Sequence, residues 1–168
     1  MDFFIRQATP EDAEAVVRMH TLAHEETYGD HLSAEFFRTR RAGIPERVER
    51  RKPFLADSDP RIIAVDANND VVGFSDSGPG RDEDGPEALE LYSLYTLRRT
   101  HSRGLGAALL SAAIGESPAY LWVLENNPRA LVFYRKHGFR PDGKRGQLPP
   151  EWEELPEIRM VRSARAGS

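Results

Sequence analysis

The segment from Ala88 to Leu124 constrains the fold more than any other part of the chain. Residues 88–96 are apolar on nearly both strand faces, which predicts a central, buried strand. A glycine-containing turn, an apolar helix over residues 104–114 and a second strand over residues 119–124 follow. On that helix we expect one buried stripe, formed by Leu105, Ala108, Leu109 and Ala112.

The other segments complete an α/β sandwich around one mixed, mostly antiparallel sheet of about six to seven strands flanked by helices. Its remaining strands are predicted over residues 3–8, 61–66, 71–75, 139–141 and 157–161. Helices are predicted over residues 9–26, 33–41, 45–55 and 127–137, with polar loops over 27–33 and 78–86. The expected order is βα(α)ββ–βαβαββ.

Length and composition limit the function classes. With 168 residues the chain fits one domain, predicted over residues 1–162, with a disordered tail over 163–168. The absence of cysteine excludes disulfides, cysteine-ligated zinc and a cysteine nucleophile. A net charge of −4 argues against a nucleic-acid partner, and no apolar run suits a membrane. The N-terminus lacks the features of a signal peptide, so we expect a cytoplasmic protein.

The turn from His101 to Ala107 suits a phosphate group. It joins a buried strand to a helix, where backbone N–H groups have no intrahelical partner and the helix dipole adds positive charge. Gly104 and Gly106 remove side chains that would block a pyrophosphate. Further phosphates could be neutralised by Arg98, Arg99 and Arg103.

Two alternatives compete with that interpretation. The turn could be only a tight connection between strand and helix. It could also belong to a nucleotide-binding domain, but the third glycine of the dinucleotide pattern is replaced by Leu109, and no Gly-Lys-Ser/Thr follows.

A second motif follows about twenty residues later and carries a family resemblance. Arg103-Gly104-Leu105-Gly106, then Asn127-x-x-Ala130-x-x-Phe133-Tyr134-x-x-x-Gly138-Phe139, resembles the GNAT (GCN5-related) N-acetyltransferases over Phe3 to Val161. The chain looks most like a bacterial subgroup, matched by Glu90-Leu91-Tyr92 and Trp122-Val123-Leu124-Glu125. One departure is His101, where the family usually has Gln or Arg. The resemblance implies a GNAT-like sheet with a splayed central strand pair.

The resemblance implies acetyl-CoA as cosubstrate. Backbone groups of Leu94, Tyr95 and Thr96 would bind the pantetheine arm like an added strand, and one N–H would polarise the thioester carbonyl. The pyrophosphate would be held by Ser102, Arg103, Gly104, Leu105, Gly106 and Ala107. Asn127 would bind the cofactor or an ordered water, and before Pro128 it also suits a helix N-cap; both roles are compatible.

Two catalytic residues follow from the resemblance. Tyr134 matches the general acid that protonates the CoA thiolate. The alternative is that Tyr134 has only a structural role in the core. Glu90 matches the general base of histone-acetylating members. A Glu inside an apolar strand is costly unless it is paired or used, so its alternatives are an ion pair with an arginine or a solvated strand end.

The acceptor is expected to be a primary amine of a small molecule or peptide. The segments that shape the acceptor cleft in the family carry carboxylates here, which would attract a cationic amine: Glu25, Glu26, Asp30, Asp82, Glu83 and Asp84. The alternative, favoured for most of them, is that they are solvated loop charges. His20 and His24 share a helix face, but without a carboxylate motif no metal is expected, and a solvated or substrate-facing pair is predicted. A homodimer is common in the family.

Two function hypotheses of different classes remain open. The first is an acetyl-CoA-dependent N-acetyltransferase that transfers the acetyl group directly. The second is a non-catalytic acyl-CoA-binding or regulatory module with the same cofactor loop. Intact Tyr134 and Glu90 favour the first.

Overall fold

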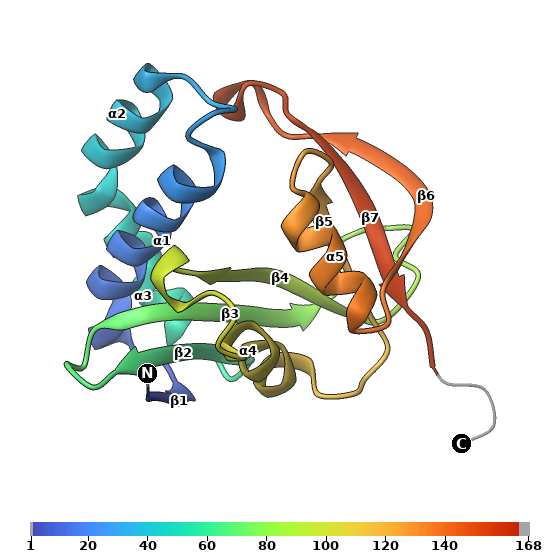
Figure 1. The fold of residues 1–168 in the computed structure, drawn as a ribbon, viewed down its shortest axis with the longest axis horizontal. Coiled ribbons are helices and arrows are strands. Elements are labelled where there is room, and N and C mark those ends of the chain that lie inside the picture. Colours follow the sequence, from blue (N-terminus) through green and yellow to red (C-terminus); the bar gives the residue numbers. More distant parts are fainter. Residues whose placement is uncertain (1, 165–168) are drawn as a thin grey trace. The chain divides into compact units, whose positions relative to one another are not determined.

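The computed structural model describes residues 2–164, and its seven strands lie in the sheet order β1-β2-β3-β4-β5-β7-β6 (Figure 1). The strands are β1 (Phe3–Gln7), β2 (Arg61–Asp66), β3 (Val71–Pro79), β4 (Leu89–Thr96), β5 (Ala119–Leu124), β6 (Arg140–Gln147) and β7 (Pro156–Arg162). The helices described are α1 (Ala13–Tyr28), α2 (Ala34–Ala42), α3 (Ile44–Leu55), α4 (Leu105–Ile114) and α5 (Pro128–Lys136). This order confirms the predicted α/β class.

The sheet is mixed. β1 pairs antiparallel with β2, and β2 with β3; β7 pairs antiparallel with both β5 and β6. β4 pairs in parallel with β5, with Glu90 opposite Tyr120 and Leu91 opposite Leu121. The fourth place of β4 in the strand order confirms that it is a central strand. The splay of the central pair stays a prediction.

The chain divides into two compact units. The first comprises Met1–Ser77 and Ser93–Gly115, and the second comprises Gly78–Tyr92 and Glu116–Ser168. β3 and β4 each contribute residues to both units. The single domain over residues 1–162 stays a prediction, and most of the tail predicted over 163–168 lies outside the described residues.

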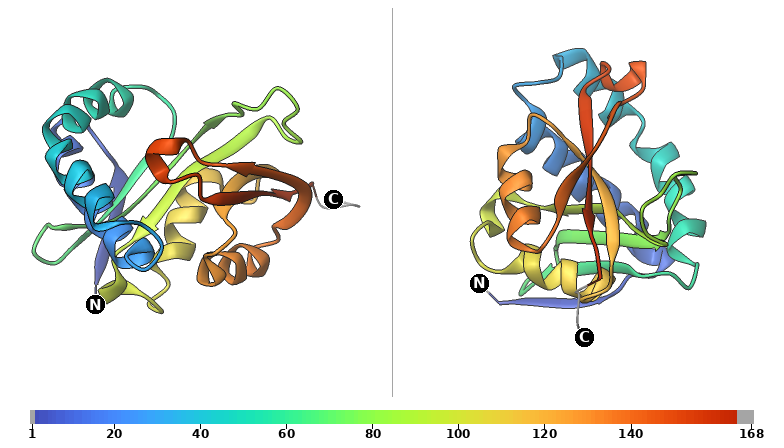
Figure 2. Two further views of the ribbon diagram at one scale, coloured as in Figure 1. Left: turned by 90° about the horizontal axis from the view of Figure 1, so that it is seen from above. Right: turned by 90° about the vertical axis from the view of Figure 1, so that its right-hand side faces the viewer.

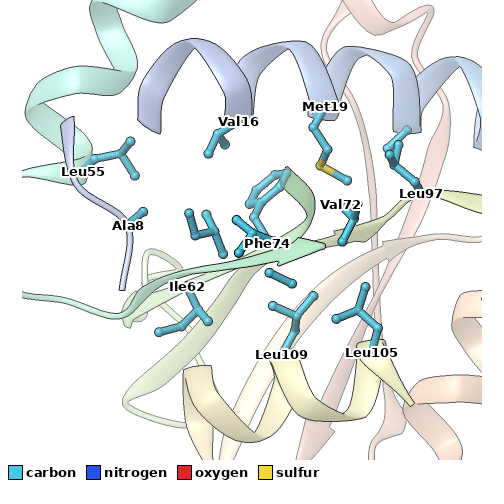
Figure 3. Packing of buried hydrophobic residues seen from close by; sticks show 14 of the residues in the cluster. Ala8, Val16, Met19, Leu55, Ile62, Val72, Phe74, Leu97, Leu105 and Leu109 are labelled. Carbon is cyan, nitrogen blue, oxygen red and sulfur yellow. The ribbon is translucent and has the colours of Figure 1, made fainter. Parts of the chain in front are cut away.

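In the first unit β3 is covered on both faces. Val16 and Met19 of α1 lie on one side of it, and Leu105 and Leu109 of α4 lie on the other (Figure 3). The Oγ of Ser75 donates to the carbonyl of Leu109 at 2.9 Å, and Ser77 makes the same bond to Ala113 at 2.8 Å. Both hydroxyl groups are fully buried. Because each donates a hydrogen bond to a backbone carbonyl of α4, neither leaves a buried donor unpaired.

Gly73 allows β3 and α4 to approach this closely. A Cβ at that position would lie 2.9 Å from Cδ1 of Leu109 and 3.1 Å from the carbonyl oxygen of Tyr95. The glycine is therefore required by packing.

In the second unit β6 and β7 pair antiparallel, with a short 3₁₀ turn over Pro150–Trp152 between them (Figure 2). The unit has its own buried apolar residues, which include Leu91, Leu121, Phe139 and Met160. Leu91 and Leu121 face each other across the β4–β5 pair, so this core is built on that pairing.

Several predicted boundaries were wrong. α1 begins at Ala13, after a 3₁₀ turn over Pro10–Asp12, and it runs through Tyr28, which was expected in a loop. The ring of Tyr28 is buried and contacts that of His24, which favours the extra turn. The break between α2 and α3 falls at Gly43, because Pro45 lies in the first turn of α3, where a missing N–H costs nothing.

Two patterns were misinterpreted. β6 runs from Arg140 to Gln147 and not over residues 139–141, because its sequence is polar on both faces and shows no alternation. On α4, Leu105 and Leu109 are buried as expected, but Ala112 is exposed and Ala108 is only partly covered. The buried face of α4 includes instead Leu110, Ala113 and Ile114, so it is wider than one stripe.

Replacing Leu109 by Ala should destabilise the fold strongly. Its side chain is fully buried against β3, so a cavity would remain and the free energy of unfolding should fall by about 2–5 kcal/mol. Urea unfolding measures this change. Leu22→Ala on the exposed face of α1 is the control and should cost far less. Equal losses in both variants would contradict the packing described.

Candidate functional site

The predicted site residues belong to both units. Leu94, Tyr95, Thr96 and the turn from Ser102 to Ala107 lie in the first unit, whereas Glu90, Asn127 and Tyr134 lie in the second.

The glycine turn has the backbone conformation that an anion-binding helix start requires. Gly104 is the N-cap of α4 and adopts φ +80°, ψ 2°, a left-handed conformation, and Ser102 has φ +64°. A Cβ at Gly104 would meet nothing within 4 Å, so backbone conformation and not crowding calls for glycine. The first helical bond runs from the N–H of Ala108 to the carbonyl of Gly104 at 3.1 Å. The N–H groups of Leu105, Gly106 and Ala107 have no backbone acceptor within residues 2–164 and are therefore available to a ligand.

The three arginines near this turn differ in their surroundings. The backbone N–H of Arg98 donates to Oε2 of Glu26 at 2.7 Å, and its guanidinium donates to the carbonyl of Glu26. Arg99 donates to Oδ2 of Asp66 at 3.0 Å. Arg103 is exposed and forms no ion pair within residues 2–164. Arg103 is thus best suited to neutralise a phosphate.

Asn127 caps α5. Its Oδ1 accepts a hydrogen bond from the N–H of Ala130 at 3.1 Å, and Pro128 occupies the first helical position. The capping role predicted for Asn127 is confirmed, and its contact with a cofactor stays a prediction.

Tyr134 packs as part of a core. Its side chain is only 8% exposed, and its ring meets that of Phe139 edge to face with centroids 5.8 Å apart. Phe133, its neighbour on α5, makes a similar edge contact at 5.2 Å. The core alternative for Tyr134 is therefore observed, and the general-acid role stays a prediction.

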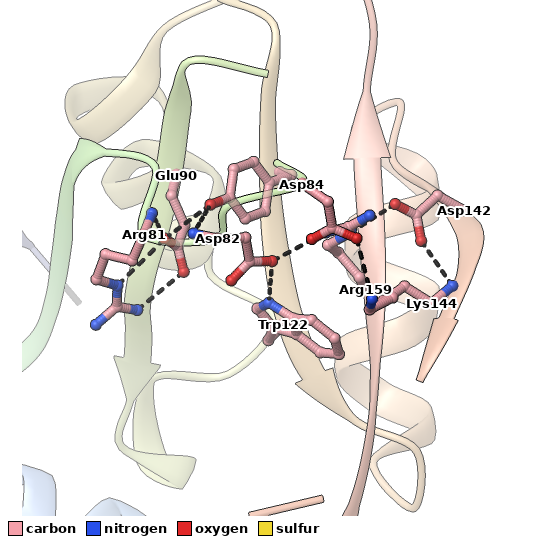
Figure 4. Close-up of polar contacts among 9 residues, drawn as sticks. Arg81, Asp82, Asp84, Glu90, Trp122, Asp142, Lys144 and Arg159 are labelled. Atoms are coloured by element: carbon pink, nitrogen blue, oxygen red, sulfur yellow. Dashed lines mark hydrogen bonds and ion pairs between the residues drawn. The ribbon is translucent and has the colours of Figure 1, made fainter. Parts of the chain in front are cut away.

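Glu90 is a buried carboxylate with four donors (Figure 4). It is 2% exposed, and Arg81 donates to it from its backbone N–H at 2.9 Å and from its guanidinium at 2.9 and 3.2 Å. The hydroxyl of Tyr120 donates to Oε2 at 3.2 Å. These bonds offset the cost of burying the charge. The arginine ion pair left open as an alternative is present, and the general-base role stays a prediction.

Arg159 of β7 is the centre of a network that the sequence did not reveal (Figure 4). Its guanidinium contacts Asp142 at 2.6 Å and both Asp82 and Asp84 at 3.0 Å. Burial lowers the pKa of Arg159, but the hydrogen bonds that it donates to these carboxylates outweigh burial and raise the pKa. In the sequence, the only indication of such a network is an arginine between two apolar residues of a strand, Ile158 and Met160.

The same network orders the loop between β3 and β4. Asp82 accepts from Nε1 of Trp122 at 2.9 Å, and its backbone N–H donates to the hydroxyl of Tyr120 at 2.9 Å. Lys144 contacts Asp84 at 3.0 Å. The loop is thus bound to β5, β6 and β7 through charged and aromatic side chains.

Glu157 of β7 has no such partners. It lies opposite Leu124 and Gly146, and it forms no hydrogen bond or ion pair through its side chain with residues 2–164. Burial, together with the negative charge of Asp82, raises the pKa of this carboxyl group. A half-buried carboxylate with a raised pKa is a candidate proton acceptor that the sequence analysis missed.

The prediction of a solvated histidine pair is wrong for His24, which is buried, whereas His20 is partly exposed; the substrate-facing alternative stays a prediction. His24 is 1% exposed, and the Nε2 atoms of His20 and His24 are 2.9 Å apart. Both rings contact Tyr95, at centroid distances of 4.6 and 4.7 Å, and His20 also contacts Phe74. The i, i+4 spacing placed both rings on one face, but the sheet covers that face. Within residues 2–164 no group of three potential ligands could hold a metal ion.

The carboxylates expected to attract a cationic amine are largely engaged. Glu25 pairs with Arg41, Glu26 accepts from Arg98, and Asp82 and Asp84 pair with Arg159. Their charges are therefore largely compensated before any substrate arrives.

The buried histidines should make stability depend on pH. Burial lowers the pKa of His20 and His24 well below 6.5, and nearby positive charges act in the same direction. The unfolded chain therefore takes up protons first as the pH falls below about 6.5, and stability is full above that value and falls below it. Each group should contribute up to about 1.4 kcal/mol per pH unit until it also titrates in the folded state.

Urea unfolding between pH 8 and pH 5 measures that slope. A His20→Gln, His24→Gln double variant should flatten it, whereas His31→Asn, at an exposed position, should not. An unchanged slope in the double variant would contradict the assignment.

A family model for the acetyltransferase (GNAT) domain matches residues 58–141, which is half of the chain. A "probable N-acetyltransferase" of Mycobacterium tuberculosis is 29% identical over 109 residues, covering 61% of this chain and 62% of that protein. An uncharacterized N-acetyltransferase of Mycobacterium bovis is 34% identical over 96 residues, covering 52% and 59%. The matched stretches thus span about three fifths of these relatives.

Solved structures share the fold at low identity. A PaiA N-acetyltransferase of Thermoplasma acidophilum, in complex with coenzyme A, superimposes with a TM-score of 0.68 at 19% identity, covering 98% of this chain and 100% of that one. A Pyrococcus horikoshii protein gives a TM-score of 0.73 at 18% identity, with 98% and 99% covered. Within the described residues no helix is long and apolar enough to cross a membrane. With a matching family model over half its length and GNAT-type structures over nearly all of it, the chain belongs to the GNAT acetyltransferase family.

Proposed function

We propose that the protein is an N-acetyltransferase that moves an acetyl group from acetyl-CoA directly to a primary amine of a small molecule or peptide. The observation that carries the proposal is the left-handed Gly104 at the start of α4, which leaves backbone N–H groups of the turn available to an anion. Membership in the GNAT family, and the coenzyme A bound to the T. acidophilum neighbour, support the same ligand.

The first unit would supply the cofactor contacts. Backbone groups from Ser102 to Ala107 would hold the pyrophosphate, and Arg103 would neutralise part of its charge. The backbone of Leu94, Tyr95 and Thr96 would bind the pantetheine arm, with one N–H polarising the thioester carbonyl. Acetyl-CoA supplies the acetyl group as a thioester.

The reaction needs two proton movements. A bond forms between the amine nitrogen and the acetyl carbon, the carbon–sulfur bond breaks, the amine loses a proton and the thiolate gains one. Tyr134 would give the thiolate its proton, since a phenol with a pKa near ~10 can protonate the anion of a thiol with a pKa near ~8.5. Glu90 is the base that the family resemblance implies, and Glu157 is a second carboxylate in the same unit.

A non-catalytic acyl-CoA-binding module is the second candidate. One observation favours it: both proposed catalytic side chains also have structural partners. Glu90 forms an ion pair with Arg81, and the ring of Tyr134 packs against that of Phe139. Such a module would bind acetyl-CoA without releasing a thiol.

Thermal unfolding with acetyl-CoA, ATP or NAD at matched concentrations tests the cofactor. At ~100 times its Kd, a ligand should add about 2.7 kcal/mol of stability. Acetyl-CoA alone should raise the melting temperature, and an amine screen by thiol release then separates enzyme from binding module. A rise with ATP or NAD alone would refute the proposal.

Replacing Tyr134 by Phe should lower kcat by about 10²-fold while leaving the Kd for acetyl-CoA unchanged, because the lost hydroxyl acts only on the leaving thiolate. Steady-state kinetics and calorimetric titration measure the two effects. Phe133→Leu, one position earlier on α5, is the matched control for packing. Unchanged turnover in Tyr134→Phe would remove the residue from the acid role.

Two carboxylate variants separate the candidate bases. If one of these carboxylates is the general base, replacing it by Gln should remove the acidic limb of the enzyme's pH–rate profile. Because Glu90 is bound by Arg81, Glu90→Gln should also lower the melting temperature, whereas Glu157→Gln should not, since its burial raises the carboxyl pKa. A profile that neither variant changes would leave solvent as the proton acceptor.

A further inference from the structure

Five basic side chains of the first unit form a cluster that the proposed reaction does not use. This basic cluster comprises His20 and His24 of α1, Arg40 of α2, and Arg47 and Arg51 of α3. The two imidazoles are in direct contact, and both rings lie against Tyr95. The positive charges of all three arginines lower the pKa of His20, so the groups are close enough to repel one another.

Negative charge in this cluster is scarce. Both carboxylate oxygens of Asp76 are bonded to Arg51 at 2.9 Å. Arg47 donates to the neutral hydroxyl of Thr21 at 2.8 Å, and no carboxylate within residues 2–164 forms an ion pair with it. Of the neighbouring acidic residues, Glu25 is paired with Arg41 and Glu49 with Lys52.

This excess of positive charge has a physical cost. Burial, with the positive charges of Arg50 and Arg51, lowers the pKa of Arg47 to about 10. Burial, with the charge of Arg47, lowers the pKa of Arg40 to about 10. Arg47 is partly buried and has no carboxylate partner within residues 2–164, so a bound anion would relieve the cost of its charge. The planar fork of its guanidinium matches a carboxylate or phosphate.

The cluster adjoins the strand proposed to bind the cofactor. The ring of Tyr95 contacts both histidines, and the backbone of the same residue is among those proposed to bind the pantetheine arm. An anion at the cluster would therefore lie beside the strand that presents the acetyl group.

We propose that Arg47, together with Arg40 and His20, binds an anionic group of the acetyl acceptor, so that the acceptor is an amine that also carries a carboxylate or phosphate. This assignment rests on the proposed function and narrows its substrate class. It replaces the cationic amine expected from the sequence.

Acceptors that differ by one anionic group test the proposal: tyramine with tyrosine, agmatine with arginine, and ethanolamine with phosphoethanolamine. The anionic member of a reactive pair should have the higher kcat/KM. Arg47→Gln should lower that value about 10-fold or more, the loss expected for one charge-assisted hydrogen bond, and leave the other member unchanged. Arg47→Lys should restore part of it. Arg38→Gln, an exposed arginine on α2, is the control and should change neither.

A binding measurement decides the matter without turnover. Phosphate, compared with chloride at equal ionic strength, should raise the melting temperature of the wild type and of Arg38→Gln but not of Arg47→Gln. Arg47→Gln should keep its affinity for acetyl-CoA. An equal phosphate shift in Arg47→Gln, or equal kcat/KM for both members of a reactive pair, would overturn the proposal.

Two further outcomes distinguish the sources of failure. Weakened acetyl-CoA binding in Arg47→Gln would assign the cluster to the cofactor phosphates and overturn the proposal. If no amine reacts, the enzyme function fails, but a phosphate shift that depends on Arg47 would still support an anion site. Arg47→Lys serves the phosphate comparison if Arg47→Gln does not fold, and it should reduce the shift.

Discussion

The two-sided burial of β3 is the constraint on which the first unit depends. Val72 and Phe74 face the layer of α1, whereas Gly73 and Ser75 face α4. Because successive side chains of a strand point to opposite faces, one strand anchors both helix layers. The position of α4 sets the position of its N-terminus, and so the place of the glycine turn. The position of α1 sets the place of the buried histidines.

Buried charge is treated differently in the two units. In the second unit Glu90 and Arg159, which are almost fully buried, have matched partners: Glu90 is bonded to Arg81, and Arg159 to three aspartates. Such networks hold a loop and the β6–β7 pair in one arrangement, and they leave little free charge for a substrate. In the first unit Arg47 donates to the neutral hydroxyl of Thr21 and forms no ion pair with a carboxylate of residues 2–164. That contrast separates the structural network around Arg159 from the cluster that we propose binds an anion.

Much of the fold and part of the candidate site could be predicted from local chemistry. The glycine turn could be predicted because a glycine stands between a central strand and the start of a helix. The cap at Asn127 could be predicted because an asparagine precedes a proline at a helix start. The extent of β6 could not be predicted, because its residues are exposed on both faces and its strand conformation depends on pairing with β7. The buried face of α4 was misjudged because small alanines fit an exposed face as readily as a buried one.

By itself the sequence determined the order of the elements, the turn after β4 and the family motif around α5. Each of these depends on residues that are neighbours along the chain, where backbone preference and hydrophobic periodicity act directly. Only the tertiary structure decided that His24 is buried and contacts His20 and Tyr95, that Glu90 is bonded to Arg81 and that Arg159 binds three carboxylates. These facts depend on contacts between residues far apart in sequence, and burial and charge pairing of that kind leave no local pattern to detect.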